Sequence, residues 1–293
     1  MTSDPILALE SLGYTDREAA FVYLVAVHSG YFLRRQFDYF IDRQKGAIAH
    51  HFLDKARRLG HVRPIDLPQG RKVYHLFAKP IYRLLGDAES QNRRIKLDAS
   101  IRVRLIALDY VLENSNDHYL ELSPARLQYF GEVRRIPREF FTNARGSLIA
   151  FLDAFPISLA DRTAPLTTRV RFLFVDEGLF TTTRFVRFLT LLEPLLRSVG
   201  NFELVYAANS RHNFDAARDA FERRFAELSP AQAALSQDWL RPVARNRTHK
   251  FPPLQARFTT VLFNHHYPMI WRHERLGSRA GSPLGATEME ASL

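Results

Sequence analysis

The spacing of apolar residues changes at Gly60, and this change constrains the fold more than any other feature of the sequence. Before Gly60 the apolar residues recur at helical spacing, as Ala49, Leu53 and Ala56 do. After Gly60 they alternate with polar residues, which is the pattern of a β-strand. A chain with this pattern is expected to begin as short helices and to continue as a β-hairpin.

Cap residues and glycine stops bracket the apolar stretches on both sides of Gly60. Pro5 follows the candidate N-cap Asp4, and residues 15–18 have the sequence of a capping box. The predicted elements are a helix from Pro5, helices at 19–28, 33–42 and 45–59, strands at 61–67 and 71–77 joined by a turn at 68–70, and a short helix at 81–85.

Strands and helices alternate in the C-terminal half from residue 169 onward. Buried strands are predicted at 169–176 and 202–208, and helices at 181–199 and 214–228. This alternation implies a right-handed crossover and a parallel or mixed sheet. A longer helix at 96–112, associated with Arg93, Arg94, Lys96, Arg102 and Arg104, is predicted to connect the two halves.

Helices followed by a two-stranded hairpin with a basic tip and a further short helix are the order of a winged helix-turn-helix. The predicted fold class is α+β, with an N-terminal winged helix-turn-helix followed by a mixed α/β domain. The predicted segments are a winged helix-turn-helix at 1–87, a basic linker helix at 88–115, an α/β domain for oligomerisation or partner binding at 116–276, and a disordered tail at 277–293.

The sequence contains no cysteine, which excludes disulfides, cysteine-ligated zinc, iron–sulfur clusters and a cysteine nucleophile. Apolar residues make up 46% and charged residues 25%, as in an ordinary folded protein. No apolar run approaches the roughly 18 residues of a membrane-spanning helix, and the N-terminus carries acids where a signal peptide carries lysines. We expect a soluble cytoplasmic protein with no membrane partner.

The formal net charge of +10 is concentrated in one region. Residues 34–104 hold 17 basic and 7 acidic side chains, so this region carries the whole excess. A basic region of this kind attracts polyanions, because phosphate neutralisation releases condensed counterions. A solvated basic face that only keeps the protein soluble is the alternative.

The predicted helix at 45–59 presents polar and basic side chains opposite its apolar face, as a recognition helix in the major groove does. Its glycine-containing start would let phosphates approach the backbone, and the hairpin would reach the neighbouring DNA backbone. The candidate DNA-binding residues are Arg43, Gln44, Lys45, His50, His51, Lys55, Arg58, Gln69, Arg71 and Lys72.

Structural roles are open for several of these residues. His50 and His51 could pack half-buried against neighbouring aromatic rings. Basic residues in the last helical turn, Arg57 above all, favour the helix dipole without any ligand. Arg71 and Lys72 could serve only to prevent pairing of the hairpin edge with other strands.

Residues 31–87 resemble the winged-helix segment of the replication-relaxation family and of similar proteins encoded on plasmids and integrative conjugative elements. The resemblance covers about 60 residues and rests on QF at 36–37, the basic helix, GHV at 60–62 and VYHL at 73–76. The stretches at 151–159, 169–178 and 201–210 are more weakly similar to that group's C-terminal half, which resembles a restriction-endonuclease-like core. The resemblance implies a DNA-binding role in a mobile element.

A metal-dependent nuclease is the enzyme alternative. Asp153, Asp176 and Glu177 could supply the carboxylates that hold a divalent metal. No lysine stands two positions after Asp176 or Glu177, and Lys250 is the only lysine of the C-terminal part. Arginine cannot replace lysine in proton transfer. We therefore expect no enzyme activity.

The sequence lacks a Walker motif, a GxGxxG motif and an HExxH motif, so we expect no cofactor and no metal. The polar and aromatic stretch at 264–271 is expected to be structural. The predicted function is that of a double-stranded DNA-binding regulator of transcription, replication or transfer, whose α/β half dimerises or recruits a partner. A non-catalytic protein-interaction scaffold is the remaining alternative.

Overall fold

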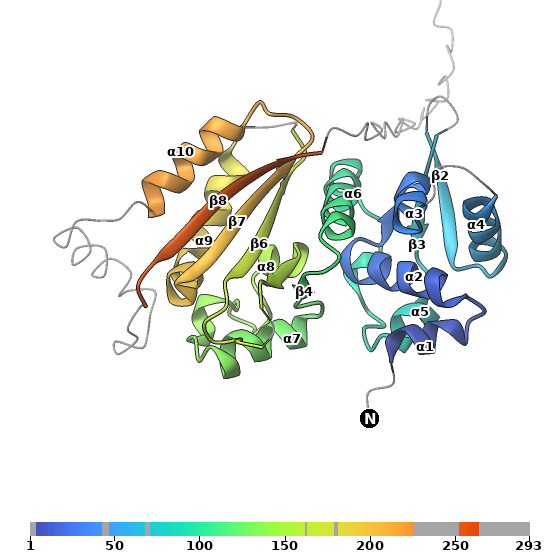
Figure 1. Cartoon of the computed structure of the whole chain (residues 1–293), viewed down its shortest axis with the longest axis horizontal. Helices are drawn as coiled ribbons and strands as arrows, with labels where there is room; N and C mark the ends of the chain where they lie inside the picture. Colours follow the sequence, from blue (N-terminus) through green and yellow to red (C-terminus); the bar gives the residue numbers. More distant parts are fainter. Residues whose placement is uncertain are drawn as a thin grey trace, which may run out of the picture.

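The computed structural model describes residues 4–42, 47–67, 71–161, 163–178, 181–225 and 252–263. This part of the chain is a mixed α+β protein in which helices accompany two β-sheets (Figure 1). The predicted tail at 277–293, the stretch at 264–271 and Lys250 lie outside the described residues.

Short helices and a small antiparallel sheet make up the N-terminal half. The strand order is β1-β3-β2, with Tyr31 opposite His75 and Ile65 opposite Val73. The predicted helices and hairpin strands are found here to within three residues of their expected ends. The elements are α1 (Pro5–Glu10), α2 (Asp16–His28), β1 (Tyr31–Phe32), α3 (Arg34–Phe40), α4 (Ile48–Arg58), β2 (Val62–Asp66), β3 (Lys72–Leu76), α5 (Lys79–Leu84) and the 3₁₀ helix η2 (Gln91–Arg93).

Both ends of α2 have a local physical explanation. The Thr15 hydroxyl accepts from the Glu18 amide (3.4 Å), and the Glu18 carboxylate accepts from the Thr15 amide (2.8 Å), which completes the predicted capping box. At the other end Gly30 has a φ of +76°, and a Cβ there would lie 2.1 Å from the backbone oxygen of Asn92. Only glycine therefore lets η2 pack against this turn.

The C-terminal half contains a five-stranded sheet of order β4-β5-β6-β7-β8. β4, β5 and β6 pair antiparallel, whereas β6, β7 and β8 pair parallel. The elements are α6 (Asp98–Glu113), β4 (His118–Tyr119), α7 (Ser123–Gln128), the π-helix η3 (Tyr129–Val133), the 3₁₀ helix η4 (Arg138–Phe140), α8 (Ala150–Ala154), β5 (Ile157–Leu159), β6 (Val170–Asp176), α9 (Thr183–Val199), β7 (Asn201–Ala208), α10 (Phe214–Phe225) and β8 (Gln255–Leu262).

Helices cover both faces of the large sheet. α9 and α10 pack on one face, and α6 packs against β6 and β7 on the other (Figure 1). The mixed sheet with its β6-α9-β7 crossover confirms the prediction made from residue 169 onward. β8 was not predicted, because its apolar residues Phe258 and Val261 are three positions apart and lack the strict alternation of a half-buried strand.

α6 belongs to the cores of both halves. Ile101, Leu105 and Ile106 pack in the core of the large sheet, whereas Leu108 and Leu112 pack among α2, α4 and the small sheet. A helix that is apolar on all sides is buried on all sides. The expected basic helix differs from the one found, because α6 begins at Asp98. Arg93, Arg94 and Lys96 precede it, and Arg102 is buried within it.

Within the described ranges, no helix has both the length and the apolar character needed to cross a membrane.

Candidate nucleic-acid interface

α4 has one buried face and one exposed face. The buried face consists of Ala49, Phe52, Leu53 and Ala56, as its period predicts. Phe52 stacks on Phe37 of α3 with ring centroids 4.2 Å apart, which fixes the rotation of α4 about its axis. The exposed face carries His50, His51, Asp54, Arg57 and Arg58.

A hydrogen bond joins the exposed faces of α3 and α4. Arg34 donates from Nη1 to Nε2 of His50 at 2.7 Å, since a guanidinium has no acceptor. Arg34 also lies 3.5 Å from Asp38, one turn further along α3. The His50 ring is therefore held at the surface beside a cation instead of packing half-buried on an aromatic ring.

Lys55 occupies a different position from the other candidates on α4. Its ammonium group donates to Glu18 of α2 at 2.6 Å, and the Glu18 carboxylate is mostly buried. Glu18 already caps the start of α2, so this ion pair connects α4 to that cap. The Lys55 side chain is thus half-buried and paired with α2, whereas the side chains of His51 and Arg58 are exposed to solvent.

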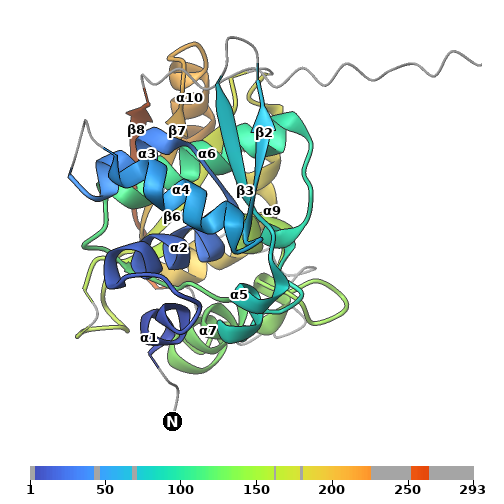
Figure 2. The same cartoon turned by 90° about the vertical axis from the view of Figure 1, so that its right-hand side faces the viewer.

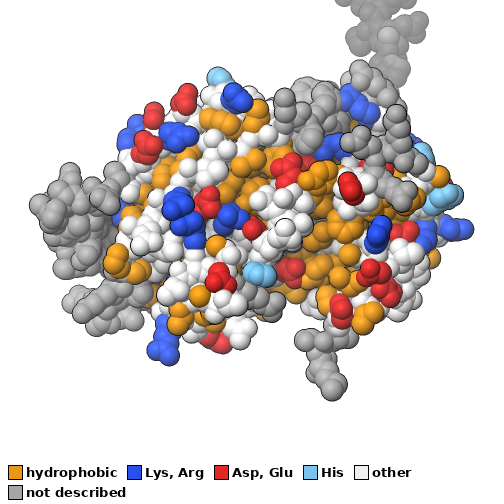
Figure 3. Space-filling model, in the orientation of Figure 1, with side chains coloured by type: hydrophobic (Ala, Val, Ile, Leu, Met, Phe, Trp, Pro, Cys, Tyr) orange, Lys and Arg blue, Asp and Glu red, His pale blue; other side chains and the backbone are white. Residues whose placement is uncertain are grey.

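The β2–β3 hairpin lies beside α4 on the same side of the molecule (Figure 2). At its described end Lys72 is exposed and lies 3.5 Å from Asp66 across the strands, and Arg71 is half-buried. Figure 3 shows basic and histidine side chains at this edge of the molecule. The structure therefore brings the candidates His50, His51, Arg58, Arg71 and Lys72 to one end of the protein.

Four candidate residues cannot be placed. Arg43, Gln44 and Lys45 precede α4 in the sequence, Gln69 stands between β2 and β3 in the sequence, and all four lie outside the described residues.

Four further side chains of this region were not among the candidate DNA-binding residues: Arg34, Tyr39, Arg57 and Tyr74. Tyr39 on α3 is 60% exposed. Arg34 and Arg57 lie close enough to the nearly buried Tyr74 of β3 to oppose the effect of burial, which raises the pKa of its hydroxyl. The spacing of Arg34 and Asp38, one helical turn apart, could have indicated that Arg34 lies on the exposed face of α3. Only the fold brings Tyr74 of β3 close to Arg34 and Arg57.

The carboxylates considered for a nuclease have other partners. Asp176 ends β6, and its Oδ2 accepts from the Tyr206 hydroxyl (2.6 Å) and from Nδ2 of Asn213 (2.9 Å). Glu177 accepts from Arg184 at 2.9 Å, and burial raises the pKa of Glu177. Asp153 lies on α8 and accepts from the Ser123 hydroxyl. Among the residues that the structure describes, no group of three or more His, Asp or Glu side chains is arranged to hold a metal ion.

Comparison of the chain with protein-family models, with curated proteins and with solved structures gives no match.

Proposed function

We propose that this protein binds double-stranded DNA through a winged helix-turn-helix formed by α2, α3, α4 and the β2–β3 hairpin. The observation that carries the proposal is the exposed row of His50, His51, Arg57 and Arg58 on a helix whose opposite face is packed, directly beside a hairpin with a basic end. In this arrangement α4 is the recognition helix and the hairpin is the wing.

The dimensions of α4 suit this role. Its 11 residues correspond to a length of about 16 Å, and a helix about 10–12 Å across fits the major groove, which is about 12 Å wide. Arginine can donate two hydrogen bonds to one guanine, and either histidine can donate to a base acceptor or to a phosphate. Lys72 on the wing would contact a neighbouring phosphate as a point charge.

Two acidic residues reduce the positive charge of this surface but do not neutralise it. Asp54 lies on the exposed face of α4, 3.8 Å from Arg57, and Asp66 lies beside Lys72. Such exposed pairs contribute little to stability, so DNA phosphates can compete for the cations. A carboxylate in the major groove also accepts from the amino group of cytosine. In this arrangement Asp54 would favour a cytosine at the position that it faces.

A regulatory role beyond DNA binding is proposed from the resemblance of the N-terminal segment. The similarity of residues 31–87 to replication-relaxation proteins favours a regulator of replication or transfer of a mobile element. The C-terminal α/β half would then provide contacts to a second copy or to another protein. The partners described above for Asp176, Glu177 and Asp153 do not favour the nuclease alternative.

Fluorescence anisotropy with a labelled DNA duplex of mixed sequence tests the proposal. The double variant His51→Ala/Arg58→Ala is expected to weaken binding at least about tenfold, since base and phosphate contacts are worth about 1–3 kcal/mol each. Arg145→Ala, in an exposed turn of the other half, is the matched control and should bind as the unaltered protein does. DNA affinity that is unchanged in the double variant would contradict the proposed surface.

Salt dependence provides a second measurement. A plot of log affinity against log salt should lose about 0.9 of its negative slope for each phosphate contact removed. Lys72→Ala is expected to show this loss with every duplex sequence. A protein that shows no salt-dependent affinity for DNA at all would favour the interaction scaffold instead.

A further inference from the structure

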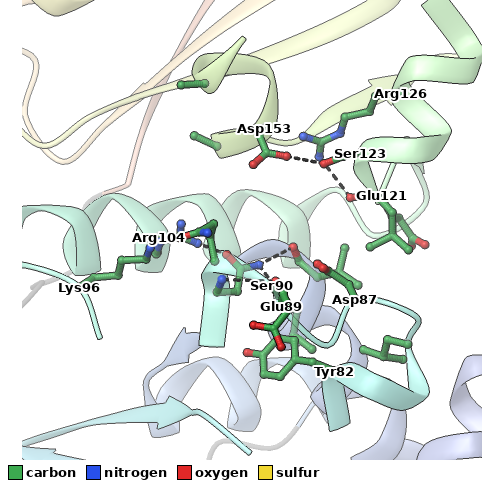
Figure 4. A pocket seen from close by; sticks show the side chains of 18 residues that line it. Tyr82, Asp87, Glu89, Ser90, Lys96, Arg104, Glu121, Ser123, Arg126 and Asp153 are labelled. Atoms are coloured by element: carbon green, nitrogen blue, oxygen red, sulfur yellow. Dashed lines mark hydrogen bonds between the residues drawn. The ribbon is translucent and has the colours of Figure 1, made fainter. Parts of the chain in front are cut away.

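A cavity of about 330 Å³ lies between the two halves of the described chain (Figure 4). The end of α2, α5 and the η2 region form one wall, and α6, α7 and α8 form the other. Pockets for small molecules start at about 300 Å³. The cavity is therefore large enough for one small metabolite, and it is separate from the proposed DNA-binding surface.

Three cationic side chains, Lys96, Arg104 and Arg126, line the cavity, and Asp153 lies near enough to Arg104 and Arg126 to stabilise their charges. Arg104 donates to the backbone oxygen of Ser29 at 3.0 Å and to the side-chain oxygen of Asn92. Arg126 is 4% exposed and donates to backbone oxygens, among them that of Leu120 at 2.6 Å. Burial lowers the pKa of Lys96, and the nearby Arg104 lowers it further. Lys96 and Arg104 are half-buried, and cations in such a partly desolvated position are stabilised by a bound anionic group.

The same cavity is lined by four carboxylates, Asp87, Glu89, Glu121 and Asp153. Asp153 accepts from the Ser123 hydroxyl and lies on the same side of the cavity as Arg126 (Figure 4). Glu89 is already paired with Lys79 at 2.8 Å and with Arg93 at 3.5 Å. Glu121 accepts from the Tyr23 hydroxyl, and Asp87 forms no ion pair within the described ranges. In Figure 4, Lys96 and Arg104 lie together on one side of the cavity, and Asp87 and Glu121 lie on the other.

Lys96 and Arg104 thus face Asp87 across a space instead of pairing with it directly. A simple anion would be attracted to Lys96 and Arg104 but repelled by Asp87, and a simple cation would meet the reverse. A molecule with a negative and a positive group complements both sides and leaves neither side without a partner.

We propose that this cavity binds a free α-amino acid. The carboxylate of the amino acid points toward Lys96 and Arg104, and its ammonium group points toward Asp87. The bound molecule thereby connects the segments on either side of η2 to α6.

Thermal unfolding of the full chain in the presence of each common L-amino acid at about 10 mM tests the proposal. Binding only to the folded protein should raise the melting temperature by about 5 °C when the ligand is in large excess over its Kd. Acetate and methylammonium, at the same concentration and ionic strength, carry only one of the two groups and should raise it far less. Titration calorimetry with the most effective amino acid then gives its Kd.

Two variants identify the site. Lys96→Met and Asp87→Asn remove one charge from each side of the cavity, and neither side chain forms an ion pair among the described residues, so both variants should fold. Each is expected to raise the Kd at least about tenfold. Lys72→Met, on the hairpin, is the matched control and should leave the Kd unchanged.

Three results would overturn the proposal. In the first, no amino acid raises the melting temperature more than acetate or methylammonium does, and in the second, acetate alone reproduces the full shift. In the third, both cavity variants bind the amino acid with the Kd of the unaltered chain. Water or a buffer ion would then occupy the space. The measurements involve no DNA, so their outcome is independent of the proposed function.

Discussion

Arg35 of α3 and Asp109 of α6 form a two-point ion pair, with Nη1 2.8 Å from Oδ1 and Nη2 2.7 Å from Oδ2. The Asp109 side chain is only 6% exposed. The pair connects the helix that supports α4 to the helix shared by both cores. It therefore links the proposed DNA-binding region to the rest of the protein.

Removal of Arg35 should destabilise the protein strongly. In Arg35→Met the buried Asp109 carboxylate loses its cation, and such a loss costs about 3–5 kcal/mol. The free energy of unfolding in urea measures the effect. The double variant Arg35→Met/Asp109→Leu should recover a large part of this loss, because no buried charge then remains. A single variant as stable as the original protein would mean that the pair has no structural importance.

Gly30 should tolerate no side chain. Gly30→Ala combines a positive φ with a Cβ contact at 2.1 Å to backbone, so η2 must move away. We expect a loss of more than about 2 kcal/mol in the free energy of unfolding. Gly146 is the matched control, since its φ is +77° and no atom lies within 4 Å of its added Cβ. Gly146→Ala should cost only the conformational strain of about 1 kcal/mol. Equal losses in the two variants would contradict the packing described for η2.

The free energy of unfolding should decrease as the pH falls below about 6.5, and part of this decrease should come from the buried ring of His75. This ring is 1% exposed and stacks on Tyr31 at 4.3 Å, and burial lowers its pKa to about 4. The unfolded chain therefore binds a proton between pH 6.5 and pH 4 that the folded chain does not bind, which favours unfolding in that range. The expected loss attributable to His75 is about 3 kcal/mol at pH 4.

Urea unfolding at pH 7 and at pH 4.5 checks this prediction. His75→Gln has no titrating ring, so its stability should change less between the two pH values than that of the original chain. His51→Gln, at an exposed position, should show the original pH dependence. The same pH dependence in the two variants would show that the His75 ring is accessible to protons in the folded state.

Lys55 and Arg58 should differ in what they contribute. Because Lys55 is paired with Glu18, Lys55→Ala should lower the free energy of unfolding and change the salt dependence of DNA binding little. Arg58→Ala should leave the free energy of unfolding nearly unchanged and should reduce the salt dependence of DNA binding, since Arg58 is exposed on the outer face of α4. Urea unfolding and anisotropy measured on both variants separate the two roles. A loss of salt dependence in Lys55→Ala equal to that in Arg58→Ala would show that the ion pair opens to reach DNA.

The order of helices and strands followed from local signals. Apolar spacing predicted α4 and its buried face, the alternation around Val73 predicted β3, and the pattern from residue 169 predicted β6, α9 and β7. Such patterns act within a few residues, because the periods of helix and strand decide which side chains share a face. β8 was missed, because its sequence lacks a regular alternation of polar and apolar residues.

The arrangement of these elements depended on contacts between distant residues. Nothing local to Lys55 indicates that it pairs with Glu18, 37 positions earlier. The charges around the cavity likewise come from distant segments, because the fold brings Asp87 and Lys96 to the same space as Glu121 and Asp153.

The sequence by itself determined the elements, the concentration of positive charge in residues 34–104 and the absence of cysteine chemistry, since each of these is a property of composition or of short-range periodicity. Only the tertiary structure decided which cations are exposed and which are engaged. The reason is that burial and pairing depend on the partner that the fold brings near each side chain. Lys55 and Arg58 are three residues apart on one helix, yet they differ in burial and in ion pairing.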